Sequence, residues 1–407
     1  MKWYEGSLAL MVLLMLLIPN LLGIGILLFL IIWVIGIVQK KLQFKFFWMN
    51  GFLFLLYLGY VIGTIYTNHP DIASRYLEYK LSLVIFPMFF SFIPKKSFSF
   101  QAPVIAFVLG VSTLFFVGLI HSIPLYIKFS DFAFMQSSQF SFIHHPTYLS
   151  AFALFGMGLL WHGWKQNWRF FSKKAIVLFM VIMLLTQILS LSLSGMLLLM
   201  ICSGVVILFL IKKKFGRKIY WATLIVTPFL LFALAKFTPG VNTQFKNSID
   251  YLVEFFDDPD AFYKSKQTYV GGSETRLILW AASSQVVAEH PMGVGTGNLD
   301  EYLSDKLISI GQPHMAEKKY NPHNQFLQTA VELGLLGLAA LLVIIVFGVF
   351  YSFRTKNYLL LLLVSSLAFN CLFESMLQRQ SGIVFYVFWI CLLIASKSYT
   401  AKMERNQ

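Results

Sequence analysis

Two short stretches of this sequence carry residue types that can bind a phosphate or move a proton. The first runs Ser-Glu-Thr-Arg-Leu-Ile-Leu-Trp over residues 273–280 and places Arg276 four residues before Trp280. This pattern predicts a helix capped by Ser273, with the arginine and the tryptophan on one face. A guanidinium presents parallel N–H groups to a phosphate, so this face can bind an anionic ligand.

The second stretch is Asn-Pro-His-Asn at residues 321–324, followed by an apolar helical pattern. An asparagine followed by proline predicts a helix start, with Asn321 as the cap and His323 in the first turn. Unpaired amides at such a turn attract a phosphate, and Asn324 adds a polar side chain there. The imidazole of His323 titrates near neutral pH and suits a general base.

Between these stretches lies a glycine-rich segment, Pro-Met-Gly-Val-Gly-Thr-Gly-Asn, at residues 291–298. Three glycines at alternate positions let a backbone approach a ligand closely. We expect the flanking residues His290 and Asn298 to shape this turn. The segment does not follow a predicted strand, so the spaced glycines do not indicate a dinucleotide-binding fold.

The composition places these stretches in a membrane protein. Of the 407 residues, 58% are hydrophobic and 12% are charged, against roughly 25% charged in an ordinary soluble domain. The formal net charge of +14 comes from short basic clusters between apolar runs, which is the pattern of the positive-inside rule. Nucleic-acid binding is therefore excluded, and the three cysteines lie in apolar runs without a metal or redox spacing.

The apolar runs predict an all-α polytopic membrane protein with about twelve transmembrane helices. A single helix over residues 8–38 would be about 46 Å long, against a hydrocarbon core of about 30 Å, so we expect two helices broken at Pro19. The further spans lie near residues 46–66, 81–93, 102–121, 146–164, 175–190, 195–211, 219–235, 335–352, 357–373 and 382–396.

The basic clusters alternate along the chain and place both termini in the cytoplasm. Residues 1–235 then form an N-terminal bundle of about nine spans, and residues 236–322 form one large, partly helical extracytoplasmic loop that carries the site motifs. Residues 323–407 supply a periplasmic helix and the last three spans. The clusters that fix this frame are Lys40–Lys45, Lys95–Lys96, Lys165–Lys174, Lys212–Lys218 and Arg354–Lys356.

The ordered motifs resemble those of the O-antigen ligase and O-antigen polymerase family of bacterial polytopic membrane glycosyltransferases. That family shows an Arg-x-x-x-Trp helix, then His-Pro-x-Gly-x-Gly-x-Gly-Asn, then Asn-Pro-His-Asn-x-x-Leu followed by Glu-x-Gly-x-x-Gly. Here these motifs are Arg276 to Trp280, His290 to Asn298, and Asn321 to Gly337, in the same order. The helix count and the position of the loop extend the likeness across most of the chain.

The resemblance implies transfer of a glycan from undecaprenyl diphosphate to an acceptor hydroxyl, with inversion and without a metal or other cofactor. The partners are then the lipid bilayer, the lipid-linked donor, and lipid A core or a growing glycan as acceptor. The protein would lie in the bacterial inner membrane with its site on the periplasmic face. Arg276 would neutralise the departing diphosphate, His323 would be the base, and Trp280, Asn298 and Asn324 would bind substrate.

One position departs from the family pattern. Family members often carry a Ser-Arg pair at the outer end of a mid-chain span, whereas this chain has Gly195 where the arginine is expected. A second phosphate-binding cation must then come from elsewhere. The candidates on the outer side are Arg75, Lys80 and Arg379.

Two other features are open to a structural or a functional reading. Glu332 follows His323 on the same predicted helix and either orients the site or stabilises the helix end. The pair His144-His145 lacks the His-x-x-x-His spacing of a zinc site, so no metal is expected there.

Several functions remain open on the sequence alone. Within the enzyme class, a ligase, a polymerase of O-antigen or exopolysaccharide, and a transferase that glycosylates proteins would share the same donor chemistry. From another class, a transporter of polyprenyl-linked glycans would need ionisable residues deep within spans and a two-half repeat, and neither is clear here. A non-enzymatic assembly scaffold is the third class.

Overall fold

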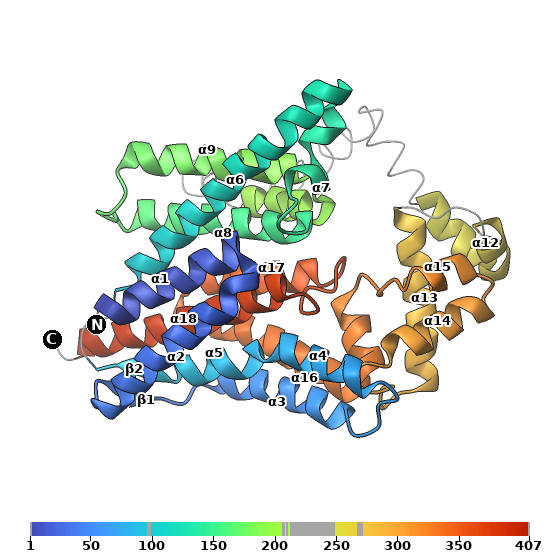
Figure 1. Ribbon diagram of the computed structural model, residues 1–407, viewed down its shortest axis with the longest axis horizontal. Coiled ribbons are helices and arrows are strands. Elements are labelled where there is room, and N and C mark those ends of the chain that lie inside the picture. The colour runs from blue at the N-terminus through green and yellow to red at the C-terminus, as the bar shows by residue number, and fades with distance from the viewer. Residues whose placement is uncertain are drawn as a thin grey trace.

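The computed structural model describes residues 2–95, 99–205, 208, 211, 249–266 and 272–405, and these residues are almost entirely helical (Figure 1). The helices before residue 200 are α1 (Lys2–Leu17), η1 (Pro19–Leu21), α2 (Leu22–Val38), α3 (Trp48–Gly63), α4 (Pro70–Lys80), α5 (Ser82–Phe90), α6 (Gln101–Phe129), η2 (Phe132–Met135), α7 (Ser137–Phe140), α8 (Pro146–Lys165) and α9 (Lys173–Ser190). The later helices are α12 (Pro259–Ser265), α13 (Ser273–Glu289), α14 (Leu299–Ser309), α15 (Pro313–Glu317), α16 (Gln325–Thr355), α17 (Tyr358–Asn370) and α18 (Gln380–Arg405).

Helices of membrane length identify a polytopic membrane protein. Among the described residues, four apolar helices are long enough to cross a bilayer: Pro19–Val38, Gln101–Phe129, Lys173–Ser190 and Gln325–Thr355. Shorter apolar helices cover Trp48–Gly63, Leu193–Val205, Tyr358–Asn370 and Gln380–Ser396. The all-α class is therefore confirmed, whereas the expected count of about twelve spans is not established. The predicted span at residues 219–235 lies outside the described residues.

The two ends of the molecule differ in the elements they carry. Strands β1 (Leu42–Phe44) and β2 (Phe92–Pro94) form an antiparallel ribbon that pairs Gln43 with Ile93. This ribbon joins two of the basic clusters, since the backbone N–H of Lys95 donates to the carbonyl of Lys41 at 3.0 Å. Both chain termini lie at the ribbon end, and α12–α15 lie at the opposite end (Figure 1).

The expected spans agree with the structure in one place and differ in another. The chain breaks at Pro19 as predicted, because α1 ends at Leu17 and η1 begins at the proline. The predicted span at residues 81–93 is instead the nine-residue helix α5, about 14 Å long and shorter than a hydrocarbon core of about 30 Å. The helix stops there because the residues that follow pair with β1 and end at Pro94.

The main core is built around α18. Every residue of this helix from Ile383 to Ala395 is buried, as expected of a helix that is apolar all round. The ring of Trp389 packs edge-on against Phe107 of α6 and Phe155 of α8, at centroid distances of 5.1 and 5.0 Å. The helix α18 is thus the axis of the bundle.

The segment that carries α12 to α15 has a core of its own. Leu279 and Val286 of α13 pack with Leu303 of α14 and Met315 of α15, and Val331 of α16 joins the same cluster. Residues 273–317 are therefore a folded helical unit, docked on the first turns of α16, and not a loose tether. This agrees with the partly helical loop that the sequence predicts.

A sharp break in α16 anchors the glycine-rich turn. Gly334 has a φ of +69°, so the helix is kinked there and the carbonyls before it lose their helical partners. The amides of Val294 and Gly295 replace those partners by donating to the carbonyls of Val331 and Glu332 at 2.8 and 3.1 Å. A Cβ on Gly293 would lie 2.4 Å from the amide nitrogen of Gly334, so only glycine fits. The glycine-rich turn, which the sequence predicts to approach a ligand closely, instead approaches the backbone of α16.

Candidate functional site

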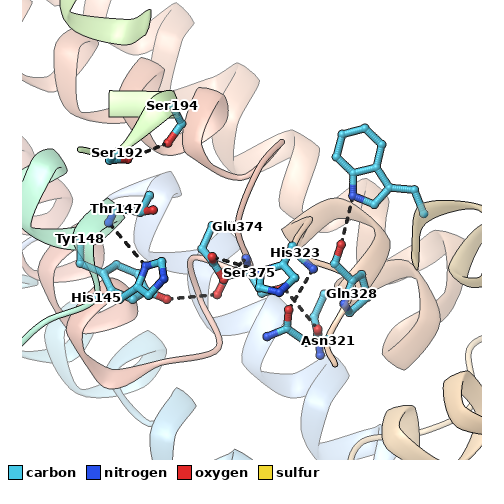
Figure 2. Close-up of polar contacts among 12 residues, drawn as sticks. His145, Thr147, Tyr148, Ser192, Ser194, Asn321, His323, Gln328, Glu374 and Ser375 are labelled. Carbon is cyan, nitrogen blue, oxygen red and sulfur yellow. Dashed lines mark hydrogen bonds and ion pairs between the residues drawn. The ribbon is translucent and has the colours of Figure 1, made fainter. Parts of the chain in front are cut away.

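His323 stands in a strained turn directly before α16. Its φ is +47°, a left-handed conformation that few non-glycine residues adopt and that often marks a functional position. The side chain of Asn321 holds this turn by accepting the backbone N–H of His323 at 2.9 Å. The imidazole is part-buried and faces the neighbouring turn between α17 and α18 (Figure 2).

The predicted start of the helix is three residues too early. Asn324, and not Asn321, is the N-cap, because its Oδ1 accepts the amides of Phe326 and Leu327 at 2.9 and 3.1 Å. His323 therefore precedes the helix and is not in its first turn. The amide of Gln325 also has a partner, the carbonyl of Cys371 at 2.8 Å. The first amides of α16, expected to be open to a phosphate, are thus bonded within the protein.

A carboxylate that the sequence reasoning missed pairs with His323. The Nδ1–H of His323 donates to Oε2 of Glu374 at 3.2 Å, and Oε1 of Glu374 accepts the amide of Ser375 at 3.1 Å. Burial would raise the pKa of the Glu374 carboxyl, but the hydrogen bond and charge of His323, the charge of His145 and the Ser375 amide together lower it. Glu374 is therefore ionised at neutral pH, and it pairs with Nδ1 of His323 and not with Nε2.

A second imidazole, His145, lies on the other side of Glu374 (Figure 2). His145 is the N-cap of α8, and its Nδ1 accepts the amide of Thr147 at 3.4 Å. Packing against protein lowers the pKa of His145, the negative charge of Glu374 opposes this, and the charges of Arg379, His323 and Arg276 lower it further. Arg276 and Arg379 therefore lie close enough to His145 for their charges to act on it.

Helix α13 carries Arg276 and is fixed next to the His323 turn. The helix begins at Ser273 and ends at Glu289, as predicted, although Gly272 and not Ser273 takes the cap position. One turn after Arg276, the indole N–H of Trp280 donates to the carbonyl of Pro322 at 3.0 Å. Trp280 thus ties α13 to the residue that precedes His323. Among the described residues Arg276 has no ion-pair partner.

The other outer cations lie in three different settings. Arg75 is exposed on α4 and pairs with Asp71 at 3.3 Å on the surface of the same helix. Lys80 is 1% exposed and donates to Oε1 of Gln378 at 2.7 Å, so its ammonium is turned into the protein. Arg379 is exposed and acts on His145 electrostatically. Of these three candidates, Arg379 is the one that the structure brings to the His145 and Glu374 group.

The side chain of Asn298 belongs to the glycine-rich turn. It is 1% exposed, its Oδ1 accepts the hydroxyl of Thr67 at 2.8 Å, and its Nδ2 donates to the carbonyl of Val294 at 2.8 Å. Asn324 is likewise occupied, since its Nδ2 donates to the carbonyl of Leu372 at 3.3 Å besides capping α16. Both asparagines position backbone segments around the site.

The structure also explains the glycine where an arginine is expected. A Cβ on Gly195 would lie 1.6 Å from Oγ of Ser150 and 2.8 Å from Nε2 of Gln187, so the packing of α8 and α9 leaves no room for a side chain. His144 is similarly enclosed, with Nε2 donating to the carbonyl of Leu16 at 2.6 Å and Nδ1 facing the Ser381 hydroxyl at 2.9 Å.

No metal-binding cluster is found in the described part of the chain, where no three His, Cys, Asp or Glu side chains are grouped as ligands. The residues that the sequence reasoning missed, Glu374 and the site role of His145, carry weak signals. Both are polar groups at the outer ends of apolar spans, where an ionisable residue has a raised chance of being functional.

Comparison with known proteins finds one family model and one curated relative. Residues 178–342 match the family model described as O-antigen ligase, so this segment of the chain is similar to that family. Arg276, Trp280 and His323 lie within it, whereas His145 and Glu374 lie outside. A protein of Haemophilus influenzae, described only as uncharacterized, is 25% identical over 195 residues. That similarity covers 44% of this chain and 46% of the relative, so it spans less than half of either protein.

Proposed function

We propose that this chain, whose residues 178–342 match the O-antigen ligase family, is a membrane glycosyltransferase that uses a polyprenyl-diphosphate-linked glycan as donor. The observation that carries the proposal is the His323–Glu374 pair, in which a buried carboxylate holds an imidazole at 3.2 Å. An imidazole oriented in this way is the usual arrangement of a general base. The guanidiniums of Arg276 and Arg379 act on the neighbouring His145 and would meet the charge of a departing diphosphate.

The reaction then proceeds in one displacement. The hydroxyl oxygen of the acceptor attacks the anomeric carbon of the donor, and its proton passes to Nε2 of His323. The bond between the anomeric carbon and the diphosphate oxygen breaks, and the electron pair of that bond stays on the diphosphate. Attack from the side opposite the leaving group inverts the anomeric configuration. Glu374 stabilises the imidazolium formed on His323.

The two arginines act on the leaving group. Arg276 and Arg379 both act electrostatically on His145, so a diphosphate bound there would lie within reach of both guanidiniums. Arg379 thereby takes the place of the family arginine that Gly195 excludes. The proposed transfer needs no metal, because the charge that develops on the diphosphate is met by these side chains.

The setting of the site suits a lipid-borne donor. The site lies at the end of the bundle that carries α12–α15, opposite the β1–β2 ribbon and both termini (Figure 1). The basic clusters of the ribbon end favour the cytoplasm, so we assign the site to the periplasmic face of a bacterial inner membrane. A diphosphate at the membrane surface is then presented directly to His323.

The identity of the acceptor distinguishes a ligase from a polymerase, because both activities share this chemistry. We favour the ligase, with lipid A core as acceptor, because the matched family is that of O-antigen ligases. The test is to delete the gene and analyse the surface glycans of the strain. Lipid A core without O-chains supports the ligase, and cores capped by a single repeat unit support the polymerase. Unchanged glycans would contradict both.

A further inference from the structure

A cluster of buried polar side chains lies beneath the site, where α3, α4 and α16 meet the turn between α17 and α18. Lys80 of α4 is 1% exposed, and Gln328 and Glu332 of α16 are fully buried. Charged groups are rarely buried at such a depth unless they are paired and have a role. The proposed reaction uses none of these side chains directly.

Lys80 connects the first outer segment of the chain to the α17–α18 turn. Its Nζ donates to Oε1 of Gln378 at 2.7 Å and lies over the rings of Tyr60 and Tyr76, at 4.4 and 5.4 Å from their centroids. Burial lowers the pKa of Lys80, and the negative charge of Glu332 opposes that shift. The ammonium is thus held by one amide, two aromatic faces and a buried carboxylate.

One face of α16 holds the same turn from the other side. Oε1 of Gln325 accepts the amide of Leu377 at 2.7 Å, and Oε1 of Gln328 accepts the hydroxyl of Ser375 at 3.4 Å. Nε2 of Gln328 in turn donates to Oε1 of Glu332 at 3.0 Å. These residues follow one another at intervals of three or four along the helix, so they form one polar row.

The turn held in this way is the one that presents Glu374 to His323. Glu374 lies four residues before Gln378, the partner of Lys80, and its own Oε1 accepts the amide of Ser375. A shift of about 1 Å in the position of a catalytic group can cost roughly 100-fold in rate. Any side chain that fixes this turn therefore controls the position of Glu374 relative to His323.

We propose that Lys80 is a positioning residue, which holds the α17–α18 turn through Gln378 so that Glu374 stays paired with His323. The inference rests on the proposed function of this site. Lys80 does not touch the substrate. Lys80 couples the position of α4 to that of the Glu374 carboxylate, and Glu332 is the counter-charge of Lys80.

Two variants test this role. Lys80→Met alone would remove the positive charge that acts on the buried Glu332 and would destabilise the protein, so Lys80→Met is combined with Glu332→Gln. Gln378→Met cuts the same link while leaving the buried charges in place. The control is Gln166→Met, an exposed side chain after α8. Each purified protein is assayed against pH with membranes from the deletion strain, which supply both lipid-linked donor and acceptor.

We expect Gln378→Met and the double variant to lower kcat by roughly 10-fold to 100-fold with little change in KM for the donor. Gln378→Glu restores an oxygen acceptor for the Lys80 ammonium and should recover most of the lost kcat. The control should match the wild type in both respects.

Three results would overturn the inference. Wild-type rates in Gln378→Met would show that the turn needs no such anchor, and an equal loss of rate in Gln378→Glu would indicate a structural role only. If the double variant fails to fold, Gln378→Met decides alone. Wild-type transfer by His323→Ala would instead overturn the proposed function, and the inference with it, so the two failures are distinguishable.

Discussion

Nδ1 of His323 lies 3.2 Å from Oε2 of Glu374, a residue 51 positions further along the chain. The whole of α16 and α17 separates the two residues, and the pair forms because α17 returns along α16. The amide of Gln325 donates to the carbonyl of Cys371 where the two ends of this hairpin meet. The imidazole and its carboxylate therefore come from the two ends of one helical hairpin, and neither can be placed without the other.

Replacing Glu374 by glutamine should remove the charge while keeping the shape of the side chain. The amide cannot stabilise an imidazolium as a carboxylate does, so we expect kcat to fall by roughly 100-fold or more. The measurement is glycan transfer by purified protein in detergent, with the apparent melting temperature as the check on folding. A correctly folded Glu374→Gln protein with wild-type kcat would argue against a catalytic role for the His323–Glu374 pair.

Replacing Arg276 by lysine should test the geometry of the proposed contact between Arg276 and the diphosphate, and not the charge of that side chain. Lysine keeps the positive charge but cannot offer two parallel N–H groups to one phosphate. We expect inorganic pyrophosphate to inhibit transfer about tenfold less well in Arg276→Lys, which corresponds to about 1.4 kcal/mol. The exposed Arg169, changed to lysine, serves as the matched control. Equal inhibition of Arg276→Lys and this control would place the diphosphate elsewhere.

The two outer arginines form a matched pair, because both are exposed and only one lies at the site. Arg379→Ala should lower kcat/KM for the donor by roughly 10-fold, since a charge-assisted contact with the diphosphate is lost. Arg75→Ala should have little effect, because its surface pair with Asp71 contributes about 0–1 kcal/mol at most. Both variants are compared in the same transfer assay. A larger effect of Arg75→Ala than of Arg379→Ala would indicate that the second phosphate-binding cation is on α4.

The lowered pKa of Glu374 also predicts how stability depends on pH. A carboxyl group whose pKa is lower in the folded protein stabilises the fold above its ordinary value of 4.5, and this contribution is lost as pH falls through the folded value. The apparent melting temperature of the wild type should therefore fall more steeply below pH 4.5 than that of Glu374→Gln. Parallel curves for the two proteins would show that Glu374 is not held as an ionised partner.

The helices could be predicted largely from the sequence, because apolar runs and proline breaks are local signals. The end of α13 and the break at Pro19 follow from such signals. The short helix α5 could not be predicted, since it is cut off by the pairing of Phe92–Pro94 with residues some fifty positions earlier. That pairing depends on the tertiary fold.

The site was predicted in part for the same reason. Arg276 and Trp280 stand in a motif with helical spacing, and the structure places their helix next to the turn that carries His323. Asn321 fits a cap on local grounds as well as Asn324 does, but Asn324 is also held by the carbonyl of Leu372 and takes the position. Glu374 has no motif around it, and its role depends on the hairpin that carries it back to His323.

The central claim is tested most directly by the rate of glycan transfer in His323→Asn. Asparagine keeps a hydrogen-bonding side chain in the left-handed turn but cannot accept the acceptor's proton at neutral pH. We predict a kcat at least roughly 100-fold below the wild type, with inhibition by inorganic pyrophosphate unchanged because both arginines remain. Wild-type transfer by a folded His323→Asn protein would contradict the account.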